Sequence, residues 1–191
     1  MQRIGLFGGT FDPVHLGHLL VAQAAYEELE LSRLFFIPAA QSPFKPESNP
    51  APAAARLRLL RLALAGQSQY EVDEQEIRRG GMSFTIETVR DYVARYPGTE
   101  LFYLIGADQV EQLEKWRSAE ELARLVQFAV IPRSGATMVT ERPPFRLRML
   151  QGFPVGIASS QIRARVRAGL PIQPLVPAAV AEAIRNSRLY L

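Results

Sequence analysis

The sequence predicts an α/β fold: a doubly wound, mainly parallel sheet with helices on both faces and a small helical C-terminal part. Two observations lead to this prediction. Short apolar runs that end at glycine or proline alternate along the chain with longer segments of helical periodicity, which is the pattern of repeated βα units. The runs at 34–37 and 101–105 are apolar throughout, as expected of strands buried on both faces.

The expected strands are short apolar runs bounded by turn residues. In chain order we place them at 4–7, 34–37, 70–77, 101–105, 128–131 and 147–150. The first two stop at Gly8 and Pro38. The run at 70–77 carries four acids and is expected to be half exposed, whereas the run at 147–150 is the weakest.

The expected helices lie between these strands, where apolar residues recur every three to four positions. In chain order we place them at 18–29, 53–64, 85–96, 109–113, 118–125, 160–168 and 177–187. The inward face expected of the first consists of Leu19, Leu20, Ala24 and Leu29. A proline-rich surface loop at 41–52 precedes the second helix, and Gly66 follows it as a C-cap.

Composition excludes several kinds of chemistry. The 191 residues are 48% hydrophobic and 21% charged, which suits one globular domain over residues 1–191. The chain has no cysteine, so disulfides, thiolate metal sites and thiol nucleophiles are ruled out. Its two histidines are His15 and His18. Any chemistry that needs an imidazole is therefore confined to one place near the N-terminal end.

Charge is distributed unevenly along the chain. The formal net charge is +3, but residues 142–191 hold eight arginines and one acid, Glu182. Such an excess attracts anions, although arginines on solvated helices explain it equally well and we favour that explanation. No basic stripe interleaved with aromatic residues supports nucleic-acid binding. The sequence contains no signal peptide and no apolar run of about 18 residues, so we expect a cytoplasmic protein outside the membrane.

The strongest candidate for a functional site is the loop after the first strand, residues 8–18, which we call the histidine loop. Glycines at 8, 9 and 17 allow a ligand to approach the backbone, and the helix that follows offers its N-terminal dipole to an anion. The two imidazoles donate hydrogen bonds to phosphate oxygens. Ligands of doubly wound sheets bind beyond the carboxyl ends of the strands. The histidine loop is therefore expected to bind phosphate.

Three other phosphate, dinucleotide or metal sites do not match the histidine loop. A P-loop requires a Gly-Lys-Ser/Thr sequence, and no lysine is present in residues 8–18. A dinucleotide-oxidoreductase fingerprint requires G-x-G-x-x-G and an acid at the end of the second strand, which are both missing. A zinc site requires three or four ligands, and Asp12 is the one further candidate near the two histidines.

A second candidate phosphate site lies at the start of a C-terminal helix. Residues 159–163 read Ser-Ser-Gln-Ile-Arg, so that Ser159 or Ser160 is placed to cap the helix and Arg163 to supply a cation. Free N–H groups at a helix start also favour an anion. Taken alone, the segment is better explained as an ordinary capped helix with a solvated arginine.

The histidine loop carries a specific resemblance. Residues 11–18, Phe-Asp-Pro-Val-His-Leu-Gly-His, resemble the F-D-P-x-H-x-G-H signature of the nucleotidyltransferase superfamily. The lead-in at 5–10 is similar to the bacterial nicotinate mononucleotide adenylyltransferase branch. Residues 159–163 resemble the S-S-T-x-I-R motif of that family, with Gln161 in place of threonine. Residues 42–45 resemble its P-P-H-K loop, with Phe44 in place of histidine.

The resemblance covers nearly the whole chain and implies an activity. It implies transfer of the adenylyl group of ATP to nicotinate mononucleotide, giving deamido-NAD and pyrophosphate in NAD biosynthesis. The phosphate of the acceptor is itself the nucleophile in such a reaction, and Mg²⁺ arrives with ATP rather than in a protein-held metal site. The implied catalytic residues are His15, His18, Lys45 and Arg163.

The resemblance also implies the binding residues. Those for ATP are Gly8, Gly9, Thr10, Phe11, His15, His18, Gly106, Asp108, Ile131, Arg133, Ser159, Ser160 and Arg163. Those for nicotinate mononucleotide are Lys45, Thr85 and Trp116. From the residues alone, Lys45 equally fits a solvated loop and Trp116 an anchor that packs a loop.

Two further functions stay open. A phosphopantetheine adenylyltransferase shares both phosphate motifs, but the Gly-Gly-Thr lead-in, Trp116 and the length of the chain disfavour it. A non-catalytic nucleotide-binding protein is disfavoured by the intact histidine pair. The sequence leaves a homo-oligomer open.

Overall fold

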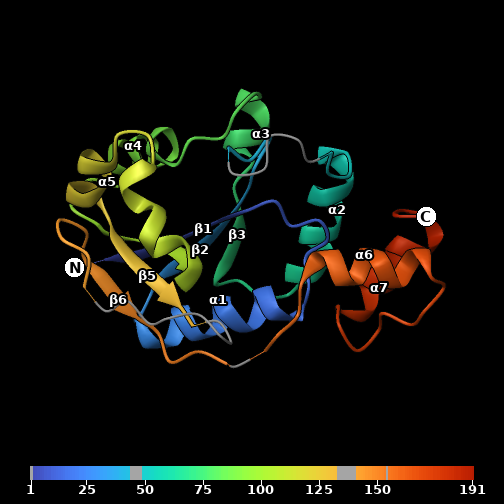
Figure 1. Ribbon diagram of the computed structural model, residues 1–191. Coiled ribbons are helices and arrows are strands. Elements are labelled where there is room, and N and C mark those ends of the chain that lie inside the picture. Colours follow the sequence, from blue (N-terminus) through green and yellow to red (C-terminus); the bar gives the residue numbers. More distant parts are fainter. Residues whose placement is uncertain (1, 44–48, 133–140, 154) are drawn as a thin grey trace.

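The computed structural model describes residues 2–43, 49–132, 141–153 and 155–191. In this part of the chain, six strands form one sheet in the order β3-β2-β1-β4-β5-β6, and every neighbouring pair is parallel (Figure 1). They are β1 (Arg3–Gly9), β2 (Arg33–Pro38), β3 (Tyr70–Val72), β4 (Glu100–Gly106), β5 (Gln127–Ile131) and β6 (Leu147–Met149). The predicted doubly wound sheet is confirmed, and it is parallel throughout.

The helices occur where the sequence predicts them, with one addition. They are α1 (Leu16–Glu28), α2 (Ala53–Leu64), α3 (Gln75–Arg79), α4 (Thr85–Arg95), the 3₁₀ helix η1 (Ala107–Lys115), α5 (Ala119–Leu125), α6 (Ser159–Arg167) and α7 (Ala178–Asn186). Within the described residues, none of these helices has an apolar stretch long enough to cross a membrane.

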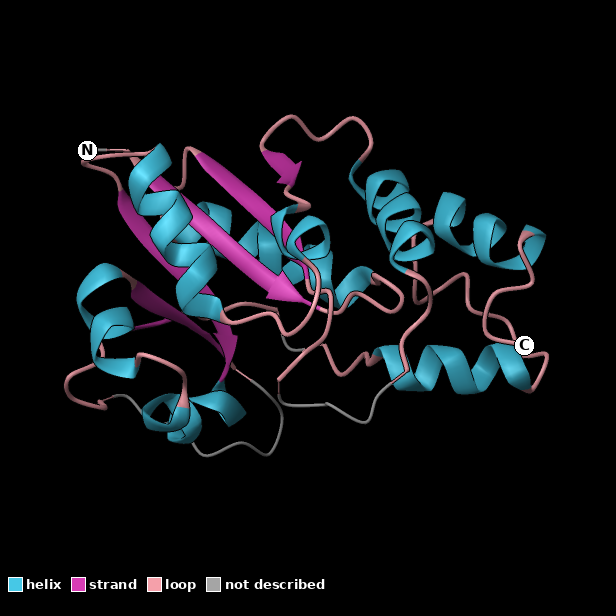
Figure 2. Cartoon of the chain, turned by 90° about the horizontal axis from the view of Figure 1, so that it is seen from above, coloured by secondary structure: helices cyan, strands magenta, loops and turns pink. Residues whose placement is uncertain are grey.

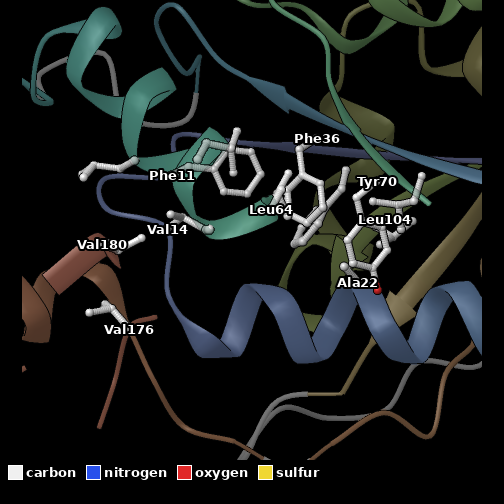
Figure 3. Close-up of a cluster of buried hydrophobic side chains, with 14 of the residues drawn as sticks. Phe11, Val14, Ala22, Phe36, Leu64, Tyr70, Leu104, Val176 and Val180 are labelled. Carbon is white, nitrogen blue, oxygen red and sulfur yellow. The ribbon is translucent and has the colours of Figure 1, made fainter. Parts of the chain in front are cut away.

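Alternate strand residues point to opposite faces of the sheet. Because both sets are apolar, helices cover both faces. Phe36 and Leu104 belong to a first apolar cluster, which also contains residues of α1, α2 and α7. Phe35 and Tyr103 belong to a second cluster, which contains residues of α4, η1 and α5. Figure 3 shows part of the first cluster, with Ala22 of α1 below the aromatic rings. Burying one such side chain stabilises the fold by about 1.5–3 kcal/mol.

The predicted inward face of α1 is partly wrong. Ala24 and Leu29 are buried as expected, and Leu19, although half exposed, packs against the first apolar cluster; Leu20 is half exposed without being part of that packing. Ala22 and Ala25 are buried in addition. Small side chains at these positions allow α1 to lie close against the sheet.

The predicted strand at 70–77 ends early. Pairing with β2 stops at Val72, and the carboxylate of Asp73 then accepts a hydrogen bond of 2.9 Å from the backbone N–H of Gln75. This side-chain turn redirects the chain into α3. The acids between 71 and 76, taken as signs of a half-exposed strand, thus belong mostly to a turn and a short helix.

The C-terminal helices α6 and α7 lie at one end of the sheet rather than over a face (Figures 1 and 2). Ile162 of α6 and Val180 of α7 still join the first apolar cluster. The backbone N–H of Leu16 donates to the carbonyl of Leu175, at 3.0 Å. The C-terminal part is therefore attached at the start of α1, next to the histidine loop.

Candidate active site

The strand order reverses between β1 and β4. The chain leaves β1 towards β2 and β3 on one side, and leaves β4 towards β5 and β6 on the other. Ligands of open parallel sheets bind at this kind of switch point, beyond the carboxyl ends of the strands. Gly8 and Gly9 end β1, and Gly106 ends β4 in register with Ile131 of β5. The structure thus brings these predicted site residues to one edge of the sheet.

The two histidines stack on each other at the start of α1. Their ring centroids are 3.7 Å apart, and the rings are inclined by 30°. The backbone N–H of His15, the N-cap residue, donates to Nδ1 of His18 at 3.2 Å. A ring nitrogen that accepts a hydrogen bond carries no proton, so the proton of neutral His18 lies on Nε2. His18 therefore offers an Nε2–H donor. Phe11 holds the other side of this ring, edge-on with the centroids 5.0 Å apart.

Each glycine of the histidine loop permits a close approach by a side chain of this protein. A Cβ on Gly8 would lie 2.2 Å from the Tyr103 hydroxyl, and one on Gly9 would lie 3.0 Å from the Phe11 ring. A Cβ on Gly17 would lie 3.0 Å from Nδ1 of His15. Distances this short force a neighbour to move. The spacing of glycine and histidine in the loop is therefore a packing requirement of the rings themselves.

The second motif meets the first across most of the sequence. The Ser159 hydroxyl donates to the carbonyl of Pro13 at 2.9 Å. Nη1 of Arg163 donates to the carbonyl of Asp12 at 2.6 Å. The start of α6 and the start of α1 therefore converge on one loop, with N–H groups, imidazoles and a guanidinium around it.

The expected serine cap of α6 is wrong. The N-cap is Ala158, because α6 already begins at Ser159, whose hydroxyl is turned towards the histidine loop. The side chain of Gln161 instead caps the start of α6, where it accepts a hydrogen bond from the N–H of Ala158 at 3.1 Å. Ser160 is exposed. The glutamine that departs from the family pattern thus orders the helix start.

A second group of predicted residues surrounds Tyr103. Thr85, the first residue of α4, donates from Oγ1 to the Tyr103 hydroxyl at 3.3 Å. Trp116 is 8% exposed, and its ring packs edge-on against Tyr103 and Phe128 at 6.0 Å from each. This is the position of a packing anchor, next to Thr85. Burial raises the pKa of Tyr103, so its hydroxyl stays protonated.

Three residues singled out in the sequence, Phe44, Lys45 and Arg133, lie outside the described residues. The loop that carries the first two does begin within them. Its N–H at Ala40 donates to Oγ of Ser83 at 3.0 Å, and the N–H of Ser83 donates to the carbonyl of Gln41 at 2.9 Å. This loop therefore starts beside the N-terminal end of α4. Asp108 is exposed in the first turn of η1.

Sequence reasoning missed several residues that support the histidine loop. Asp12 was considered only as a metal ligand, but it is 6% exposed and accepts hydrogen bonds from the Tyr190 hydroxyl and the N–H of Ala51. Arg56 is 2% exposed and donates to the carbonyl of Thr10. One signal was available for Tyr103, a hydroxyl within an otherwise apolar strand. Nothing in the sequence distinguishes Arg56 from the other arginines of α2.

The described residues contain no group of three or more His, Asp or Glu side chains that could hold a metal ion. The donors of the site are backbone N–H groups, the two imidazoles and the Arg163 guanidinium, which suit phosphate oxygens rather than cations. Together with the switch point of a parallel sheet, this set defines a nucleotidyltransferase type of site. The chain belongs to the cytidylyltransferase-like family, whose sequence profile matches residues 6–165.

Curated relatives match the chain over its full length. A protein of Opitutus terrae is 40% identical over 191 residues, which cover 99% of this chain and 98% of the relative. A protein of Geobacillus kaustophilus is 40% identical over 190 residues, covering 100% and 87%. Both are named "Probable nicotinate-nucleotide adenylyltransferase". The resemblance inferred from the motifs is confirmed.

Solved structures show the same fold at low sequence identity. The nicotinic acid mononucleotide adenylyltransferase of Plasmodium falciparum complexed with NaAD is 16% identical, with a TM-score of 0.83 over 100% of this chain and 98% of that one. The same enzyme complexed with APC gives a TM-score of 0.80 at 15% identity. At this level of identity the likeness establishes the fold.

Proposed function

We propose that this protein is a nicotinate-nucleotide adenylyltransferase, which transfers the adenylyl group of ATP to nicotinate mononucleotide and releases pyrophosphate. Its full-length relatives carry that name. The structural observation that supports the proposal best is the meeting of two motifs at one loop. His15 and His18 stack there, and Arg163 hydrogen-bonds the backbone of the same loop. We place the enzyme in the cytoplasm with its nucleotide substrates.

The reaction needs no nucleophile from the protein. An oxygen of the nicotinate mononucleotide phosphate, already ionised at neutral pH, attacks the α-phosphorus of ATP. A bond from that oxygen to the phosphorus forms while the bond to the β-phosphate bridging oxygen breaks, and pyrophosphate leaves with the electron pair. The protein accelerates this step by holding the two substrates in line and by neutralising negative charge.

The histidine loop and α6 supply the donors in this proposal. His18 donates from Nε2, the nitrogen that its hydrogen bond with the His15 N–H leaves protonated. His15, Arg163 and Lys45 complete the catalytic set. Backbone N–H groups at Gly8, Gly9, Thr10 and Phe11, together with Ser159 and Ser160 at the start of α6, bind the ATP phosphates. Helix dipoles at the starts of α1 and α6 favour the same charge.

The two nucleosides bind on either side of these phosphates. We assign the ATP nucleoside to the edge formed by Gly106, Asp108, Ile131 and Arg133, where carbonyl and carboxylate oxygens accept from a ribose diol. We assign the pyridine carboxylate to the N-terminal end of α4 at Thr85, with the ring near Trp116. A helix N-terminus favours a carboxylate over a neutral amide. The enzyme is therefore expected to prefer nicotinate over nicotinamide mononucleotide.

Magnesium enters this proposal as part of the substrate MgATP. The described residues do not form a resident metal site, which fits an ion that stays on the triphosphate and keeps most of its waters. None of the steps assigned to the protein depends on a metal ligand from the chain.

The test is pyrophosphate release from MgATP with each of three acceptors: nicotinate mononucleotide, nicotinamide mononucleotide and phosphopantetheine. We expect turnover with the first and a clearly lower kcat/KM with the second. Equal values for the two pyridine nucleotides would contradict the carboxylate site. Turnover with phosphopantetheine alone would assign the protein to another branch, and no turnover with any acceptor would indicate a non-catalytic nucleotide-binding protein.

A further inference from the structure

The buried carboxylate of Asp12 connects the histidine loop to three distant segments. Oδ1 accepts hydrogen bonds from the Tyr190 hydroxyl at 2.7 Å and from the N–H of Ala51 at 3.2 Å. Oδ2 lies 3.7 Å from Nη1 of Arg163, and the same Nη1 donates to the Asp12 backbone carbonyl. Asp12 is thus held from both ends, by its side chain and by its backbone.

The buried side chain of Arg56 also supports the histidine loop. Its guanidinium donates from Nη1 to the carbonyls of Thr10 and Ala39, at 2.8 Å each, and from Nε to the carbonyl of Ala51 at 3.0 Å. Burial lowers the pKa of Arg56, whereas the charge of Asp12 acts to raise it. A buried cation that bonds carbonyls of three loops ties the ends of β1 and β2 to the start of α2.

Tyr190 reaches this cluster from the last residues of the chain. Its backbone φ is 71°, and that of Arg188 is 51°. Bulky residues rarely adopt such left-handed values, which persist only when surrounding contacts impose them. The Leu189 side chain packs against the first apolar cluster and the chain end turns back over α7. This backbone conformation places the Tyr190 hydroxyl within hydrogen-bond distance of Asp12.

We propose that Tyr190 is a positioning residue for adenylyl transfer: its hydroxyl holds the Asp12 carboxylate, and through Asp12 it orients the histidine loop and Arg163. The reason is geometric. Arg163 takes its position from the Asp12 carbonyl and carboxylate, and His15 lies three residues further along the same loop. A displacement of about 1 Å in such groups costs on the order of 10²-fold in rate. This inference rests on the proposed adenylyl transfer.

The chain provides a matched control for a test of Tyr190. The hydroxyl of Tyr92 also donates to a carboxylate at 2.7 Å, in this case that of Asp73; Tyr92 is fully buried, whereas Tyr190 is half-buried. Tyr190→Phe and Tyr92→Phe therefore remove the same interaction at different places. We expect Tyr190→Phe to lower kcat for pyrophosphate release by about 10- to 100-fold with a small change in KM. Tyr92→Phe is expected to keep kcat within twofold of the wild type.

Thermal unfolding separates positioning from stability. Both phenylalanine variants are expected to unfold at similarly lowered temperatures, so rates are measured well below both midpoints. A second pair of variants removes Leu191 alone, whose side chain is 77% exposed, or Tyr190 and Leu191 together. Only the longer truncation is expected to lower kcat.

Two results would overturn the inference. One is a kcat for Tyr190→Phe equal to that of Tyr92→Phe. The other is an effect of Tyr190→Phe that persists undiminished in an Asp12→Ala background, where the acceptor of the Tyr190 hydroxyl is absent. A wild-type protein without adenylyl transfer would instead refute the proposed function. The outcomes are distinguishable because failure of the proposed function is seen in the wild-type protein alone, whereas failure of the inference is seen only by comparing variants.

Discussion

The protonation pattern of His18 is decided by a backbone group three residues earlier. The N–H of His15 donates to Nδ1, so the proton of the neutral ring lies on Nε2. The stacked His15 ring and the edge of Phe11 limit its rotation. A donor fixed in this way costs no reorganisation when charge develops on a phosphate.

Replacing His18 tests this arrangement at the residue scale. His18→Ala is expected to lower kcat/KM by about 10²–10³-fold, the usual cost of a lost preorganised donor, and to leave the fold intact because the side chain is half exposed. Circular dichroism and steady-state kinetics measure both. His18→Asn restores an acceptor for the His15 N–H and serves as the control: it is expected to recover stability but not rate. A His18→Ala rate within tenfold of wild type would contradict the assigned role.

Asp73 acts at the scale of elements, because it joins β3, α3 and α4. It follows the last residue of β3, and its carboxylate accepts hydrogen bonds from the Tyr92 hydroxyl and the Arg95 guanidinium at 2.7 Å each. The backbone N–H and the side-chain amide of Gln75 donate to the same carboxylate at 2.9 Å each. Burial by itself raises the pKa of Asp73, but these hydrogen bonds outweigh it, and the pKa lies below its ordinary value. The ionised form is therefore favoured in the folded protein.

This pKa predicts a pH-dependent effect of Asp73→Asn. The stabilisation from ionised Asp73 is fully present above the unfolded-state pKa, about 3.9, and is lost as the pH falls through the lower folded-state pKa. We expect Asp73→Asn to lower the free energy of unfolding by about 1–3 kcal/mol at pH 7 and the difference to shrink in acid. Urea unfolding at several pH values measures it, with Asp91→Asn, an exposed partner of Arg95, as the control. A difference that stays constant down to the acid limit would refute the assignment.

At the scale of the whole molecule, the C-terminal helices share a core with the sheet. Val176 and Val180 belong to the same apolar cluster as Val14 and Phe11 of the histidine loop, and all four side chains are drawn in Figure 3. The histidine loop and α6, which carry the two motifs, are therefore held by the same apolar cluster. We propose on this ground that residues 1–191 fold as a single domain.

A single domain is expected to unfold in one cooperative transition. Trp116, the sole tryptophan of the chain, lies in the second apolar cluster, which contains no residue of α6 or α7, so its fluorescence monitors the part of the fold without the C-terminal helices. Far-UV circular dichroism monitors all helices, including α6 and α7. We expect both signals to give the same midpoint in guanidinium chloride. Separate midpoints would indicate that the C-terminal part unfolds independently.

Much of this protein could be predicted from local sequence, for identifiable reasons. Strands buried on both faces must be apolar throughout, so the runs at 34–37 and 101–105 were recognisable. His15 and His18 were recognisable because they lie within one loop and belong to a residue type found nowhere else in the chain. The strand at 70–77 was extended too far because the turn at Asp73 depends on where its carboxylate finds donors, which is a tertiary contact.

The sequence by itself determined where strands and helices follow one another along the chain, where the histidine loop lies and to which family its motifs belong. Each of these depends on residues that are close together in the chain. Tertiary structure alone decided which supports hold that loop. The Arg56 contact with Thr10 spans 46 positions, and that of Tyr190 with Asp12 spans 178. Local pattern carries no signal for such pairs, since their hydrogen bonds exist only after the sheet and the C-terminal helices have packed together.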